Sequence, residues 1–275
     1  MPVIEFVGMP CSGKTYYCNL IKKKILNENL EIFTYTELFY TYVNKIIKLN
    51  TFETFLLNFS FKLYRINQNN FRNKSHISLK KELIRYNNSH IKKIIKSHIK
   101  LKVEKIKDKI ILNLPRKEKK IFKLLKESVN KSPISKTKKK ELLSRLKEEI
   151  IGIFMYKKLN FQNKIVLNDE GLIQRILSGL FFENEISFTK IDEKIKCLFN
   201  YHKFDLILFV DASLRILKIR SNKRRNGFVY KDMKNENMKN WQGFFAKFYN
   251  NHKEKIYKVR SKNNLNLLNS IIKTL

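Results

Sequence analysis

Residues 3–15 of the chain read VIEFVGMPCSGKT. The segment before Gly8 is short and mostly apolar, which predicts a β-strand that ends in a tight turn. Residues 8–15 match the pattern GxxxxGK[ST], and residues 14–27 place apolar side chains at helical spacing. A strand, a loop and a helix therefore follow one another in the order that a phosphate-binding loop requires.

The chemistry of phosphate binding explains the spacing of the glycines in this loop. Glycines at its start and end permit backbone angles that a Cβ atom would resist. The loop can then turn its N–H groups toward a β-phosphate, which also lies at the positive end of the following helix. The residues that we predict to surround the phosphates are Gly8, Pro10, Cys11, Ser12 and Gly13.

Two side chains at the end of the motif have specific predicted roles. We expect Lys14 to bridge β- and γ-phosphate oxygens, and the Thr15 hydroxyl to ligate Mg²⁺. The alternative is a chance match on a tight turn. The flanking strand and helix argue against it, because a chance match does not require either.

A second group of polar residues follows an apolar run at residues 164–168, which is predicted to be a strand; it reads Asn168-Asp169-Glu170-Gly171. A carboxylate at the carboxyl end of a strand beside the loop could hold Mg²⁺ through water, and we assign that role to Asp169. Glu170 could take a proton from an acceptor hydroxyl or from water. The alternative is an ordinary helix start, because acidic residues are common in the first turn of helices.

A third group follows residues 205–210, which read DLILFV and are typical of a parallel strand buried on both faces. Beyond it lie Arg220, Arg224 and Arg225, although this composition strongly favours lysine. Arginine binds phosphate in a planar, bidentate manner, so we expect these side chains to close over a triphosphate. The alternative is a solvated helix face.

The middle of the chain differs in character from both ends. Residues 61–150 contain 28 Lys and Arg against 8 Asp and Glu, and no glycine. An apolar stripe at helical spacing runs through Ile91, Ile95, Ile99, Val103, Ile106 and Ile110. We therefore predict a long basic α-helical insertion or lid at 61–150. Residues 1–60 and 151–275 alternate strands with helices, which predicts a three-layer α/β P-loop NTPase core with a parallel sheet.

The formal net charge of +34 has a compositional explanation. The chain has only two alanines and seven glycines, while Lys, Asn, Ile and Phe abound, as AT-rich codon usage would produce. The charge would still attract phosphates, anionic lipid surfaces or nucleic acid. Nucleic acid is not the favoured partner, because the sequence shows no helix-turn-helix or zinc-finger pattern and no obvious stacking platform.

Other sequence features bear on compartment and on metal sites. The three cysteines are odd in number and form no CxxC pair, so neither a disulfide framework nor a zinc site is predicted. No apolar run approaches the ~20 residues of a transmembrane helix, and the N-terminus does not look like a signal peptide. We expect a cytoplasmic protein without a transmembrane segment.

Taken in order, these segments resemble the P-loop nucleotide kinase group, and thymidylate kinase-like proteins in particular. The resemblance rests on GMPCSGKT at 8–15, NDEG at 168–171 and DLILFVDASLRILKIRSNKRRNG at 205–227, and it covers about residues 2–35 and 164–275. It implies a final strand and helix after residue 255 and an arginine-bearing lid. Thymidylate kinases carry an Asp-Arg-Tyr-like motif where this chain has Asp169-Glu170-Gly171, so the arginine that would hold an acceptor nucleotide is absent there.

The leading hypothesis is an ATP- and Mg²⁺-dependent phosphotransferase that acts on a small-molecule acceptor. Adenine is assumed, because no Asn-Lys-x-Asp pattern for guanine occurs. The alternative is a P-loop nucleotide hydrolase, an ATPase switch in which Glu170 orients water and the basic helices bind a polyanion or a protein partner. A third interpretation is a nucleic-acid binder with an incidental nucleotide site.

Overall fold

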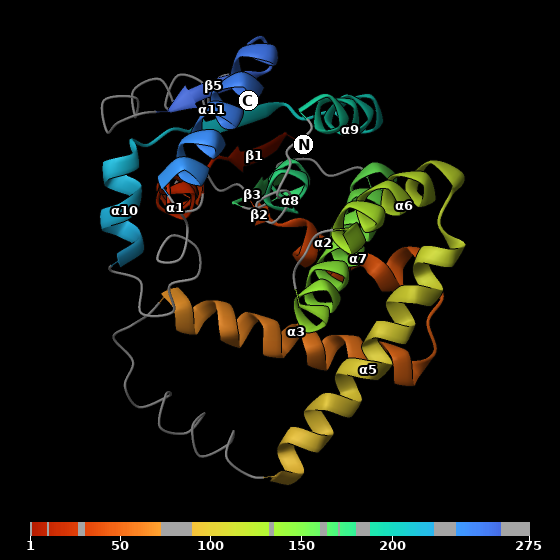
Figure 1. Ribbon diagram of the computed structural model, residues 1–275. Coiled ribbons are helices and arrows are strands. Elements are labelled where there is room, and N and C mark those ends of the chain that lie inside the picture. The colour runs from red at the N-terminus through yellow and green to blue at the C-terminus, as the bar shows by residue number, and fades with distance from the viewer. Residues whose placement is uncertain are drawn as a thin grey trace. The chain divides into compact units, whose positions relative to one another are not determined.

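The computed structural model describes residues 2–9, 11–26, 31–72, 90–131, 135–159, 164–169, 171–179, 188–222 and 235–259. They form an α/β protein with a five-stranded sheet in which every pairing is parallel, as predicted (Figure 1). The strands are β1 (Val3–Val7), β2 (Glu31–Phe33), β3 (Lys164–Asn168), β4 (Leu206–Val210) and β5 (Ile256–Val259). Their order across the sheet is β2-β3-β1-β4-β5.

The central strands are buried on both faces, which their sequences predict. All five residues of β1 and all five of β4 are buried. Ile4 pairs with Leu206 on one side and with Leu167 on the other. A continuous apolar strand can satisfy its backbone only by such pairing, and its side chains only by helices on both faces.

Helices cover both faces of the sheet, an arrangement compatible with three layers. Alternate strand residues point to opposite faces. Phe6 and Leu208 pack in one cluster with Tyr17 of helix α1 (Lys14–Leu26). The next residue along β4, Phe209, instead stacks on Phe245 of α11 (Asn235–Asn251), with ring centroids 6.1 Å apart. The other described helices that follow β3 in the chain are α8 (Leu172–Gly179), α9 (Phe188–Tyr201) and α10 (Leu214–Asn222).

The strand order creates a point where the connections diverge. The connection that contains α1 leads from β1 past β3 to β2, whereas α8 and α9 lead from β3 past β1 to β4. Two neighbouring strands thus send their chains in opposite directions from their carboxyl ends. In open α/β sheets, ligands bind at such a point. Residues 8–15 follow β1 there, and Asp169 follows β3.

The chain divides into two compact units. One contains residues 1–34, 120–146 and 160–275, and therefore the sheet; the other contains 35–119 and 147–159. The described helices between β2 and β3 in the chain are α2 (Tyr35–Ile46), α3 (Thr51–Arg72), α5 (His90–Asn113), α6 (Arg116–Lys131) and α7 (Lys136–Lys158). The described residues within 61–150 are thus largely helical, as predicted. This segment contributes to both units, and its role as an insertion stays a prediction. None of the described helices combines the length and apolarity needed to cross a bilayer.

Two helices follow the short strand β2. The strand is three residues long, and α2 and α3 come after it in the chain. The break between the helices lies at Asn50. Its Oδ1 accepts a hydrogen bond from the Glu53 N–H at 2.8 Å, and Glu53 Oε2 accepts one from the Asn50 N–H at 3.1 Å. This reciprocal cap, Asn-x-x-Glu, begins α3 and is a signal that periodicity alone overlooks.

The helical unit is organised around a buried lysine. Lys107 Nζ lies 2.6 Å from Glu148 Oε1 and 2.8 Å from Glu104 Oε1, and only 3% of its side chain is exposed. Glu148 Oε1 also accepts a hydrogen bond from the Tyr40 hydroxyl. Burial lowers the pKa of Lys107, but Glu148 and Glu104 outweigh it, and the net shift of that pKa is upward. The ion pair therefore stays charged inside the unit and ties α2, α5 and α7 together.

We expect Lys107→Ala to lower the free energy of unfolding by about 3 kcal/mol, because it leaves Glu148 buried without its cation. Urea unfolding followed by circular dichroism measures the change. The control is Lys109→Ala, which removes an ion pair to Glu53 from a lysine that is 55% exposed and should cost less than about 1 kcal/mol. Equal losses of unfolding free energy in the two variants would show that the buried ion pair stabilises the fold no more than the exposed one.

Candidate functional site

The backbone of residues 8–15, called here the 8–15 loop, adopts unusual angles at three described positions. Gly8, Cys11 and Gly13 have φ of 155°, 63° and 110°. A side chain at position 8 is also excluded by lack of space, since a Cβ atom on Gly8 would stand 2.5 Å from the carbonyl oxygen of Val210 at the end of β4. Such angles are costly for residues with a Cβ, so this path is specified by its glycines. Pro10 lies outside the described residues.

Lys14 folds back over the loop. It is the first residue of α1, is 6% exposed, and its Nζ donates hydrogen bonds to the carbonyl oxygens of Gly8 at 2.9 Å and Met9 at 3.0 Å. The sequence predicted Lys14 beside the loop as a phosphate ligand. The structure places its ammonium at the loop, where it offsets the partial negative charge of the Gly8 and Met9 carbonyl oxygens.

The residues assigned to a metal lie next to each other. β1 and β3 are paired neighbours, so the residues that follow them share one edge of the sheet. There the Thr15 hydroxyl donates to Asp169 Oδ2 across 3.3 Å, although the two residues are 154 positions apart in the chain. A hydroxyl and a carboxylate thus lie at the start of α1. Glu170, the predicted proton acceptor, lies outside the described residues.

A buried carboxylate that the sequence analysis did not single out supports this edge of the sheet. Glu5 is fully buried in β1, and its Oε1 accepts hydrogen bonds from the N–H groups of Ile173 at 2.7 Å and Gln174 at 3.1 Å. It therefore caps the N-terminus of α8 from the neighbouring strand. A Cβ atom on Gly171 would overlap the Glu5 carboxylate, which explains the glycine at that position. The signal in the sequence was an acid in the middle of an apolar strand.

Gln174 connects this cap to the 8–15 loop. Its side-chain oxygen accepts a hydrogen bond from the Gly8 N–H at 3.0 Å, and the residue is 2% exposed. The contacts run from Glu5 through the start of α8 to the first residue of the loop. The loop is consequently held from two directions, by β4 behind Gly8 and by α8 beside it.

Of the three predicted arginines, the structure describes one. Arg220 Nη1 donates to the carbonyl oxygens of Ser12 at 2.5 Å and Cys11 at 3.3 Å, and so α10 reaches the 8–15 loop. Burial raises the pKa of Tyr17 in α1, and the charge of Arg220 partly offsets that rise. A guanidinium therefore lies at the 8–15 loop, and its role toward a triphosphate stays a prediction. Arg224 and Arg225 lie outside the described residues.

One polar atom of the loop has no partner within the described part of the chain. Ser12 Oγ is buried and forms no hydrogen bond there. A buried hydroxyl without a partner costs about 1–3 kcal/mol, so its retention needs an explanation. A ligand atom that accepts a hydrogen bond from this hydroxyl would satisfy it.

No protein-family model, no curated protein and no solved structure matches this chain. The meaning of the site therefore depends on its own geometry. Four features meet at the carboxyl edge of β1 and β3: a loop with positive backbone angles, the N-terminus of a helix, two cationic side chains and a hydroxyl–carboxylate pair. Such an arrangement can hold a polyanion together with a divalent cation.

Proposed function

We propose that the chain is an ATP- and Mg²⁺-dependent phosphotransferase that holds a triphosphate on the 8–15 loop. The observation that carries this proposal is the contact between Thr15 and Asp169 beside a lysine and an arginine that both touch the loop. Positive groups would hold the phosphates, and the oxygen pair would hold the metal. Neither group would be useful at this edge without the other.

The donor set at the loop suits Mg²⁺. This ion prefers hard oxygen ligands, and it usually keeps several waters while using one or two protein oxygens and substrate phosphates. The Thr15 hydroxyl and the Asp169 carboxylate supply two such oxygens. Among the described residues there is no group of three or more His, Cys, Asp or Glu that could enclose a metal by itself. Bound Mg²⁺ would neutralise charge on the phosphates, and the chain would then need only to orient the triphosphate.

The loop residues have the work of binding and orienting the triphosphate. The Ser12 hydroxyl and the N–H groups at the start of α1 would donate to phosphate oxygens. The Lys14 ammonium would exchange its hydrogen bonds to the carbonyls of Gly8 and Met9 for hydrogen bonds to the phosphates. Arg220, already at the loop, would stabilise charge that develops during transfer.

The acceptor is assigned only as a small molecule with a nucleophilic oxygen. Glu170 follows Asp169 directly and remains our prediction for the group that takes its proton. A hydrolase differs from a kinase at this step, because water would take the place of the acceptor. The two functions share the same loop and metal site and are separated by their products.

The deciding experiment incubates the full chain with Mg²⁺ and γ-labelled ATP, with and without a panel of nucleoside monophosphates, sugars and small alcohols. A kinase gives a labelled acceptor product and little phosphate release without one. Release of phosphate that persists without any acceptor and accelerates with a polyanion supports the ATPase switch instead. If the wild-type chain neither transfers label nor releases phosphate under any condition, the proposed function is wrong.

We expect Arg220→Ala to slow label transfer about 10- to 100-fold with a smaller effect on ATP affinity, because its charge matters most as the phosphoryl group moves. Single-turnover kinetics at saturating ATP measures this rate. Arg215→Ala is the control, since Arg215 is an exposed arginine of the same helix. If Arg220→Ala matches the control, Arg220 serves only to stabilise the loop.

A further inference from the structure

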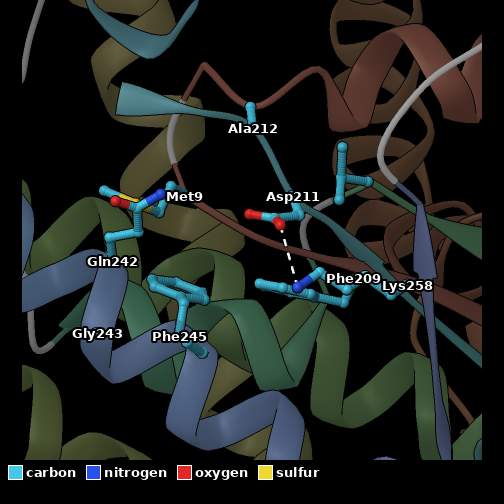
Figure 2. Close-up of a pocket in the computed structure, with 10 residues that line it drawn as sticks. Met9, Phe209, Asp211, Ala212, Gln242, Gly243, Phe245 and Lys258 are labelled. Carbon is cyan, nitrogen blue, oxygen red and sulfur yellow. Dashed lines mark ion pairs between the residues drawn. The ribbon is translucent and has the colours of Figure 1, made fainter. Parts of the chain in front are cut away.

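A cavity of about 280 Å³ opens at the carboxyl end of β4, beside the 8–15 loop (Figure 2). It lies in the unit that contains the sheet, and β4, β5, α11 and the loop all contribute to its wall. Its lining residues are Met9, Phe209, Val210, Asp211, Ala212, Gln242, Gly243, Phe245, Ala246 and Lys258. No role was assigned to this cavity by the sequence analysis.

The smallest side chains of the chain gather at this cavity. The chain has only two alanines, Ala212 and Ala246, and both line it. They come from different elements, the segment after β4 and the helix α11. Both alanines of a chain whose composition otherwise avoids alanine therefore line one cavity.

Gly243 adds an independent observation. It lies inside α11, where glycine is less favourable than alanine. A Cβ atom built on Gly243 would meet no atom within 4 Å, so packing in this structure does not require glycine there. Three of the chain's rare small residues thus border a space that the described residues do not fill.

The wall of the cavity combines aromatic and polar side chains. The rings of Phe209 and Phe245 stack at an interplanar angle of 15°. Asp211 and Lys258 form an ion pair at 3.1 Å (Figure 2), and Gln242 and Met9 also line the cavity. Flat apolar surface with a few polar groups at its edge is the environment that suits a heteroaromatic ring.

Met9 belongs both to the cavity wall and to the 8–15 loop. From this juxtaposition we propose that the cavity receives the nucleobase of the nucleotide whose phosphates lie on the loop. The inference rests on the proposed function, because it needs a triphosphate at Gly8 to Thr15. It goes further by naming where the base lies and which residues leave room for it. The donor and acceptor of the Gln242 amide would read the polar edge of the base.

The test compares two ligands that share phosphates and differ in the base. Calorimetry measures the dissociation constants of Mg²⁺–ATP and Mg²⁺–tripolyphosphate for the wild type, Gly243→Leu, Ala246→Leu and the control Asn240→Leu, an exposed residue of α11 that does not line the cavity. We expect the wild type to bind ATP at least about tenfold more tightly than tripolyphosphate. Each of the first two variants should weaken ATP about tenfold and leave tripolyphosphate and the circular dichroism spectrum unchanged.

Each other outcome overturns the inference in a recognisable way. If both ligands bind and Gly243→Leu and Ala246→Leu leave ATP affinity unchanged, the base lies elsewhere and the phosphate site stands. If both ligands weaken equally in folded variants, the cavity acts only through the loop and not through the base. If neither ligand binds the wild type, the proposed function fails together with the inference.

Discussion

Lys14→Ala is expected to lower ATP-dependent turnover about a thousandfold, or about 4 kcal/mol in transition-state stabilisation. Lys14 is buried at the 8–15 loop and its ammonium is directed at the carbonyl oxygens of Gly8 and Met9. A triphosphate brings several negative charges to the same place. A triphosphate bound to the variant would be held by backbone N–H groups and Arg220 without the Lys14 ammonium.

Two measurements separate loss of chemistry from loss of the fold in Lys14→Ala. Calorimetry should show little or no heat with Mg²⁺–ATP, while circular dichroism and urea unfolding show that the chain remains folded. Lys23→Ala is the matched control, because Lys23 is an exposed lysine of the same helix and should behave as wild type. Full turnover in folded Lys14→Ala would refute the phosphate-site assignment.

Sequence patterns predicted the features that depend on neighbours in the chain. Apolar runs predicted β1, β3 and β4, because a strand buried on both faces can contain little else. The strand β5 was implied only by the family resemblance. The 8–15 motif predicted two of the three described positions with positive φ, since glycine is the residue that permits them. Cys11 was not predicted at φ 63°, because nothing local distinguishes it.

Features that join distant segments were predicted less completely. Thr15 and Asp169 were assigned to one metal because both follow predicted parallel strands, and parallel strands end at one edge. The contact of Gln174 with Gly8 spans 166 positions and depends on how α8 packs beside the loop. Lys107 and Glu148 are two charges among many in a basic segment, and only folding shows that this pair is buried. The cavity was missed for the same reason: Ala212 and Gly243 become neighbours only when α11 packs on the sheet.

Asp169→Asn is expected to reduce Mg²⁺-dependent turnover about a thousandfold at low metal concentration, with partial recovery as metal is raised. The change removes the charge of Asp169 and keeps an oxygen that can accept the Thr15 hydroxyl hydrogen bond, so the fold of the edge should persist. Of the Thr15–Asp169 pair only Asp169 is charged, so the variant would bind a divalent ion more weakly. The metal concentration for half-maximal turnover should therefore rise. Metal titration at fixed ATP measures this shift.

Thr15 provides the second half of the same argument. Thr15→Ser keeps the hydroxyl and should retain most activity, whereas Thr15→Val keeps the shape, removes the hydroxyl and should raise the metal requirement as Asp169→Asn does. Asp108→Asn is the control, because Asp108 pairs with Lys147 at 2.6 Å and belongs to the helical unit. If Thr15 and Asp169 act on one metal, their double variant should lose less than the product of the two single losses, since the second change removes a ligand from a site already broken. Losses that simply multiply would mean that the two side chains, although 3.3 Å apart, do not share a cation.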